Sequence, residues 1–281
     1  MASSSVFVGV VTHPRSRFHA NGTHTATALV ESLKELGVNA DLLISDRNDY
    51  DPAVMGIDRS VLARSAIHQA DLEHRWRRYL AAGGAAAARS GVADRFARAG
   101  MALKRLASRD SAAAIRLLNI DLSHLRLMEA AVGSGATWSL ILEDDAGTSD
   151  ARNTAETVNG LIAAMDTTDV RFVNLSESLS FEELGVAGLL APAVDIPSVG
   201  PQLLRAIRPV TNTVCATLYR TSYLAVLRAS IVHRGLVPIA PIDWRVNEVV
   251  MDLFDQGVLD SGSCVWVQPG VFVQQSMHGK P

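Results

Sequence analysis

A short apolar run that ends in three consecutive carboxylates restricts the fold of this chain more than any other feature of the sequence. Residues 138–142 are apolar except for one serine, and loop-forming residues such as Gly147 follow soon afterwards. A short run of this composition, bounded in this way, predicts a buried strand. The strand would carry the three acids, Glu143, Asp144 and Asp145, to one edge of a sheet.

Adjacent carboxylates repel one another, so a fold keeps them together in a site only where a cation or a proton compensates their charge. Hard oxygen ligands favour Mg²⁺ or Mn²⁺, which typically binds one or two protein carboxylates while substrate phosphates complete its shell. The alternative interpretation is a strand end followed by a solvated acidic turn. The acidic cluster therefore predicts a site for Mn²⁺ or Mg²⁺.

The start of the chain has the pattern of a βαβ unit. Residues 6–11 form a continuous β-branched and aromatic run, which is typical of a central strand covered on both faces. An amphipathic helix opens near residues 21–25 and closes at Gly37, and residues 38–44 give a second strand. Together with the acidic strand, this unit predicts an α/β protein.

Polar residues follow both of these strands. Ligands of open α/β sheets lie beyond the carboxyl ends of the strands, so a nucleotide would meet the segment after the first strand. Its candidate contacts are Thr12, His13, Arg15, Arg17 and Thr23. Asp46, after the second strand, is placed to receive a ribose hydroxyl. The alternative is a solvated loop for the arginines and a backbone role for Asp46. Because the sequence has neither Gly-x-Gly-x-x-Gly nor Gly-Lys-Ser/Thr, a nucleotide sugar fits better than a dinucleotide.

The composition changes between residues 58 and 118, where Ala, Arg and Leu recur at helical spacing. This segment predicts several helices that form an insertion or lobe within one domain spanning residues 1–281. Arginines of such helices more often cover the helix surface with their stems than bind phosphate. Later in the chain, prolines at Pro192, Pro197 and Pro201 predict a long loop.

Composition excludes several classes of function. A formal net charge of −3 argues against a nucleic-acid binder, and no apolar run approaches the roughly 20 residues of a transmembrane helix. Only 2 cysteines are present, and the N-terminus lacks the pattern of a signal peptide. The sequence therefore predicts a cytoplasmic protein. Peripheral contact with the inner face of a membrane and assembly into a homo-oligomer are both left open.

The helix Ser-His-Leu at residues 123–125 and the strand end Ile-Leu-Glu-Asp-Asp-Ala at residues 141–146 carry a family resemblance. This segment resembles the lipopolysaccharide-type glycosyltransferases related to collagen galactosyltransferases. In that family a Ser-His-Leu helix precedes a strand ending Leu-Glu-Asp-Asp-Ala, the family's version of the Asp-x-Asp motif. The resemblance implies a GT-A fold, which is a Rossmann-like mixed sheet flanked by helices.

The resemblance also implies a function. The protein would be a metal-dependent glycosyltransferase that moves a sugar from a UDP- or GDP-linked donor to a saccharide or other small acceptor. Asp145 would hold the metal, while Glu143 and Asp144 would contact the ribose or the sugar. In many GT-A enzymes a histidine on the C-terminal tail completes the metal site, and His278 has that placement here. The alternative for His278 is an exposed residue near the terminus.

Two acids near residue 245 are candidates for proton transfer. Asp243 stands at the start of a predicted helix, where a capping role alone would explain it. The family resemblance places an acid facing the sugar pocket in Pro-x-Asp-Trp, which makes Asp243 the first candidate for a general base. Glu248 is the second candidate. A retaining reaction needs no such base, so the stereochemistry stays open.

Two other classes of function remain. A nucleotidyltransferase would use a similar βαβ start and acidic metal site, but it usually has a Gly-rich loop after the first strand, where this chain has Thr-His-Pro-Arg. A non-catalytic sugar-binding protein would keep the fold and lose the metal, which the intact Glu-Asp-Asp argues against. A glycosyltransferase is therefore the leading hypothesis.

Overall fold

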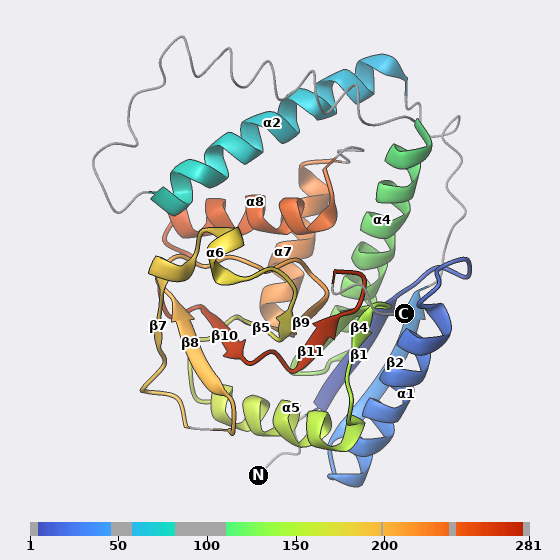
Figure 1. The fold of residues 1–281 in the computed structure, drawn as a ribbon, viewed down its shortest axis with the longest axis vertical. Coiled ribbons are helices and arrows are strands. Elements are labelled where there is room, and N and C mark those ends of the chain that lie inside the picture. The colour runs from blue at the N-terminus through green and yellow to red at the C-terminus, as the bar shows by residue number, and fades with distance from the viewer. Residues whose placement is uncertain (1–4, 46–57, 82–110, 198, 236–239, 278–281) are drawn as a thin grey trace.

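The computed structural model describes residues 5–45, 58–81, 111–197, 199–235 and 240–277 of the chain. Over these residues the protein is an α/β structure in which an eight-stranded mixed sheet is flanked by helices (Figure 1). The strand order is β2-β1-β3-β9-β5-β10-β8-β7, which is compatible with a Rossmann-like fold. The predicted α/β class, with a mixed sheet between helices, is confirmed.

The parallel half of the sheet is built from the strands that the apolar runs predicted. β1 (Ser5–Val11) lies between β2 (Asn39–Ser45) and β3 (Trp138–Glu143), and both neighbours run parallel to it. The register aligns the last residue of β1, Val11, with the last residue of β3, Glu143. The segments that leave the two strands therefore begin side by side.

The other half of the sheet is mixed. β9 is antiparallel to both β3 and β5, β10 is parallel to β5, and β8 and β7 form an antiparallel edge. These strands are β5 (Phe172–Asn174), β7 (Leu190–Pro192), β8 (Gln202–Ala206), β9 (Ala216–Arg220) and β10 (Cys264–Gln268). The segment predicted as a long loop through Pro192 thus contains strands. Pro192 fits there because its strand lies at the edge, where a missing N–H leaves no hydrogen bond unmade.

A small second sheet lies next to the acidic residues. It consists of β4 (Ala146–Gly147), β11 (Phe272–Gln274) and β6 (Ser176–Glu177), with β11 in the middle. Glu143, Asp144 and Asp145 are called the acidic tip below. Because β4 immediately follows Asp145, pairing with β11 brings the last described part of the chain beside the acidic tip. The backbone N–H of Gln275 donates to the carbonyl of Asp145 at 2.9 Å.

Helices cover both faces of the large sheet. α1 (His19–Glu35) and α5 (Ala151–Met165) contribute to the hydrophobic cluster on one face. The cluster on the other face includes residues of α4 (Ser111–Ser134), α7 (Thr221–His233) and α8 (Ile242–Asp255). Along β1, alternate residues belong to opposite clusters, as expected for a central strand covered on both sides.

Two parts of the predicted helical insertion are described. α2 (Arg59–Ala81) lies along α8, where Trp76 meets Trp244 edge to face at a centroid distance of 5.8 Å (Figure 1). Residues 111–118 form the start of α4, and residues 82–110 lie outside the described residues. Short elements, α6 (Phe181–Leu184) and a 3₁₀ turn, η2 (Ala187–Leu189), precede β7. No helix among the described residues is long and apolar enough to cross a membrane.

A glycine allows α1 to approach the acidic tip closely. A Cβ added to Gly22 would lie 2.5 Å from the carbonyl oxygen of Asp144 and 2.6 Å from its Cα. Asp144 lies in the turn between β3 and β4, and its backbone atoms cannot swing aside as a flexible side chain can. Gly22 therefore sets the distance between α1 and the acidic tip.

We expect Gly22→Ala to destabilise the protein by about 1 to 2 kcal/mol, because the contact with the backbone of Asp144 outweighs the better helix propensity of alanine. Gly133→Ala is the matched control, since Gly133 is also helical and a Cβ added to it would have no atom within 4 Å. The control should be neutral or slightly stabilising. Urea unfolding of the two variants measures the difference. Equal stabilities would show that α1 can move away from Asp144 at no cost.

Candidate functional site

A cleft of about 900 Å³ opens where β1 and β3 end. Four segments border it: the loop after β1, the first half of α4, the acidic residues after β3, and the residues that follow β11. Seven of the residues predicted for the site line it, namely Thr12, His13, Arg15, Arg17, Glu143, Asp144 and Asp145. The parallel register of β1 and β3 is what brings these residues together.

Asp144 is already held by the loop after β1. The Thr12 hydroxyl donates to the Asp144 carboxylate at 2.8 Å, and the same hydroxyl oxygen lies 2.9 Å from Nδ1 of His19. Thr12 is only 5% exposed, so this contact is sheltered from water. The hydrogen bond fixes the orientation of the Asp144 side chain at the mouth of the cleft.

Asp145 is buried, with 6% of its surface exposed. Its carboxylate accepts a short hydrogen bond from the Ser276 hydroxyl and a weak one from the Cys215 thiol, whose sulfur is 3.7 Å away. Both donors are neutral groups. Among the described residues, neither Asp144 nor Asp145 forms an ion pair with a basic side chain. Within the part of the chain that the structure describes, no basic side chain therefore compensates the charge of this pair.

Glu143 faces the cleft and contacts a buried histidine. Its Oε1 lies 3.4 Å from Nε2 of His124, and His124 is 1% exposed while the Glu143 side chain is 22% exposed. His124 belongs to the predicted Ser-His-Leu helix, but no sequence pattern predicted its contact with Glu143. This contact joins α4 to the end of β3.

Asp243 lies in the first turn of α8, one residue inside the helix, and Pro241 occupies the N-cap position. The predicted capping position is thus taken by another residue. Burial raises the pKa of Asp243 to about 6, and the negative charge of Glu143 adds to the increase. Among the described residues, Asp243 Oδ1 has no hydrogen-bond partner. Asp243 does not itself line the cleft, but it interacts electrostatically with Glu143, which does.

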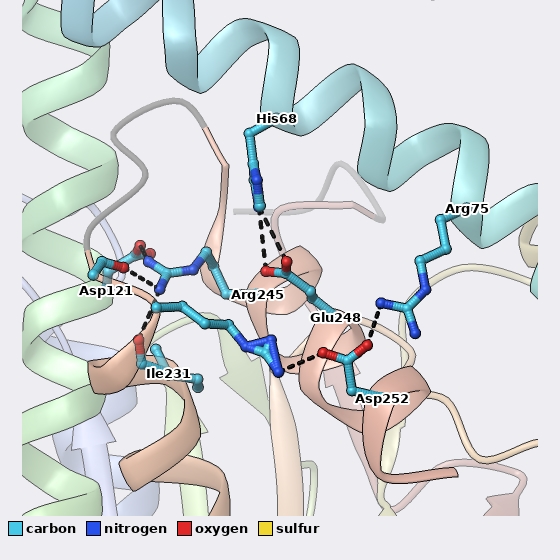
Figure 2. A network of polar contacts seen from close by, with 9 residues as sticks. His68, Arg75, Asp121, Ile231, Arg245, Glu248 and Asp252 are labelled. Carbon is cyan, nitrogen blue, oxygen red and sulfur yellow. Dashed lines mark hydrogen bonds and ion pairs between the residues drawn. The ribbon is translucent and has the colours of Figure 1, made fainter. Parts of the chain in front are cut away.

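Glu248 does not line the cleft. Figure 2 shows it paired with His68 of α2, with His68 Nε2 at 3.2 Å from its carboxylate. Burial disfavours the charged form of Glu248, but the hydrogen bond and charge of His68, with Arg234 and Arg245 nearby, bring its pKa below the usual value. The structure does not bring Glu248 to the cleft. Thr23, in α1, does not line the cleft. Asp46 and His278 lie outside the described residues.

Two walls of the cleft were not predicted from the sequence. Arg116, Asn119 and Ser123 border it from α4, at spacings of three and four residues that put them on one helix face. That spacing was available in the sequence, but arginines of this region were interpreted as surface residues. Gln274 and Ser276 border the cleft from the chain after β10. Their position depends on the pairing of β11 with β4, for which the sequence offered no signal.

The donor atoms at the acidic tip fit a hard divalent cation only in part. Among the described residues, no group of three or more His, Cys, Asp or Glu side chains is arranged to hold a metal ion. Mg²⁺ and Mn²⁺ commonly accept one or two protein carboxylates when phosphate and water oxygens complete the shell. The carboxylates of Asp144 and Asp145 meet that smaller requirement, so the cleft fits a metal that arrives together with a phosphorylated ligand.

Comparison of the sequence with models of protein families gave no match, and a search of curated proteins gave no significant match. The cleft itself therefore has to define the class of protein. Over the described residues it combines a carboxylate pair that has no basic ion-pair partner, three arginines and a Rossmann-like sheet edge. A phosphorylated ligand that arrives with a divalent cation would suit this combination.

The pKa of Asp243 predicts how pH affects stability. Since the pKa rises from 3.8 in the unfolded chain to about 6 in the folded protein, stability is lost as the pH rises through this window. Asp243→Asn removes the charge and keeps the shape of the side chain. We expect the variant to gain stability relative to the wild type by about 1 to 3 kcal/mol at about pH 7.5, and much less at about pH 4.

Chemical unfolding at both pH values measures this gain, and the exposed Asp169 provides the control Asp169→Asn. The control should show no comparable dependence on pH. A stability difference for Asp243→Asn that is constant between the two pH values would contradict the raised pKa.

Proposed function

We propose that this protein is a metal-dependent glycosyltransferase of the GT-A fold, which moves a sugar from a nucleotide-diphosphate donor to a hydroxyl of a saccharide or other small acceptor. One observation carries the proposal. The loop after β1, which holds His13 and Arg15, opens into the same cleft as Asp144 and Asp145, at the carboxyl edge of a Rossmann-like sheet. That edge is where α/β proteins bind nucleotides.

The cationic loop suits the diphosphate of the donor. Arg15 is exposed, and Arg17 stacks over the ring of Phe18 with its guanidinium carbon 4.6 Å from the ring centroid. Guanidinium groups bind phosphate oxygens with two parallel hydrogen bonds, and they stack on planar rings. The loop therefore offers charge for the phosphates and a flat surface for a base.

Asp145 would hold Mn²⁺ or Mg²⁺, as the resemblance implies. Asp144, which the resemblance assigns to the ribose or the sugar, lines the same cleft and would serve as a second ligand. When bound, the ion stabilises the negative charge that develops on the leaving nucleoside diphosphate. The hydroxyls of Thr12 and Ser276 orient the two carboxylates through the hydrogen bonds described above. Glu143, which is partly exposed in the cleft, would contact a sugar hydroxyl of the donor.

Transfer with inversion requires a group that takes the proton from the acceptor hydroxyl as the bond from the anomeric carbon to the diphosphate breaks. A general base works best when its pKa lies near the working pH. Asp243, with a pKa of about 6, meets this condition and lies in the electrostatic neighbourhood of Glu143. Glu248 is less suited, because His68 already occupies its carboxylate at the interface between α2 and α8.

Nucleotide binding tests the metal site without any need for the acceptor. We expect UDP or GDP to raise the melting temperature of the wild type when Mn²⁺ is present and to have little effect after chelation. Asp145→Asn should lower the Mn²⁺-dependent affinity by about tenfold or more, because a neutral amide is a poor ligand for a hard cation. The melting temperature without ligand should stay close to that of the wild type.

The matched control is Asp41→Asn, which makes the same change at an exposed position on β2. It should bind nucleotide as the wild type does. Unchanged affinity in Asp145→Asn would remove the metal site from the proposal. Incubation with nucleotide sugars then separates the classes. Slow release of free sugar supports a transferase, whereas formation of nucleoside triphosphate and sugar 1-phosphate after addition of pyrophosphate would identify a nucleotidyltransferase.

A further inference from the structure

The two cationic walls of the cleft come from opposite faces of the sheet. The loop after β1 leads into α1, whose Leu29 and Leu33 pack in the cluster on one face. α4 packs on the other face, where Leu127 and Met128 join the second cluster. Both segments border the cleft at the edge of the sheet. The acidic residues at the end of β3 lie at the same edge, where Asp144 accepts a hydrogen bond from Thr12 of the loop after β1 and Glu143 contacts His124 of α4. One carboxylate thus touches each wall.

The α4 wall carries a positive charge that the donor site does not need. Arg116 is exposed and borders the cleft, and within the described part of the chain it has no ion-pair partner. Asn119 and Ser123 border the cleft from the same face of α4. On the opposite wall, Arg15 and Arg17 already supply two cations for a diphosphate.

The size of the cleft leaves room for a second ligand. Its volume of about 900 Å³ lies near the upper end of the roughly 300 to 1,000 Å³ found for sites that enclose one drug-sized molecule. Asp144 contacts the loop that carries Arg15 and Arg17, and Glu143 contacts α4, which carries Arg116. These carboxylates repel an anion placed between the two walls, which disfavours a single anion that pairs with the arginines of both walls.

Building on the proposed glycosyltransferase activity, we propose that the α4 wall binds an anionic acceptor, namely a saccharide that carries a phosphate or a carboxylate. Arg116 pairs with the anionic group through the fork of its guanidinium. The side chains of Asn119 and Ser123 provide polar groups on the same helix face for the hydroxyls of the sugar. The acceptor hydroxyl then reaches the acidic tip from the side opposite the donor diphosphate.

Calorimetric titration of the whole protein tests this assignment. The probes are galactose 6-phosphate, galacturonate and neutral galactose, each titrated with and without saturating UDP and Mn²⁺. We expect the wild type to bind at least one anionic probe about tenfold or more tightly than galactose, as hydrogen bonds to charged groups allow. The probe that binds distinguishes a phosphate from a carboxylate as the recognised group.

Arg116→Gln should abolish this preference and change the affinity for UDP with Mn²⁺ by less than about twofold, since the charge it removes lies outside the donor site. Arg126→Gln is the matched control, because Arg126 is exposed on the same helix and does not border the cleft. The control should keep the full preference for the anionic probe.

The outcomes separate this inference from the proposed function. Equal binding of charged and neutral probes by the wild type overturns the inference and leaves donor binding intact. A large loss of UDP affinity in Arg116→Gln also overturns it, because Arg116 would then belong to the donor site. If the wild type fails to bind UDP or GDP with Mn²⁺ but binds an anionic probe through Arg116, the transferase proposal fails and the anion site on α4 stands.

Discussion

The parallel pairing of β1 with β3 is the constraint on which the site depends. Its register sets Val11 opposite Glu143, so the loop after one strand and the acids after the other begin at the same level. A slip of one residue would turn every side chain of β3 to the other face of the sheet, and buried positions on both faces forbid this. Two further contacts hold the strand ends together, namely the hydrogen bond from Thr12 to Asp144 and the close approach of Gly22 to the Asp144 backbone.

A buried ion pair links the α4 wall to the helix that carries Asp243. Asp121 of α4 and Arg245 of α8 are each 1% exposed and lie 3.7 Å apart, and Arg245 also donates to the carbonyls of Ile231 and Gly235 (Figure 2). Burial raises the pKa of Asp121 well above its usual value, and the charge of Arg245 opposes that rise. Pairs of this kind add little net stability, yet removing one partner costs about 3 to 5 kcal/mol because the other charge stays buried. The pair therefore fixes where the first turn of α8 lies relative to the cleft.

The sequence predicted those parts of the fold and site that depend on local pattern. Apolar runs located the central strands, and the rule that ligands lie beyond strand ends selected residues such as Thr12 and Asp145, which do meet in one cleft. The sequence could not predict the parts of the fold and the site that depend on pairing between distant segments. Ser276 reaches Asp145 only because β11 pairs with β4. Arg116 borders the cleft only because α4 packs against the sheet through another of its faces. The sequence also leaves Glu248 as the second candidate for a general base, because nothing in it predicts that His68 of α2 contacts this carboxylate.

Asp243 and Glu248 are both acids of α8, yet their pKa values are shifted in opposite directions because they pack against different neighbours. Five residues of α-helix correspond to a rotation of about 140° beyond a full turn, so the two acids of α8 face different neighbours. Burial and the charge of Glu143 raise the pKa of Asp243 to about 6, which suits the proposed role of proton acceptor. Glu248 faces α2, where the hydrogen bond and charge of His68 lower its pKa and use its carboxylate to hold two helices together. Glu248 would have to break its contact with His68 of α2 before it could accept a proton from a substrate. Within the described residues, Oδ1 of Asp243 has no hydrogen bond to break.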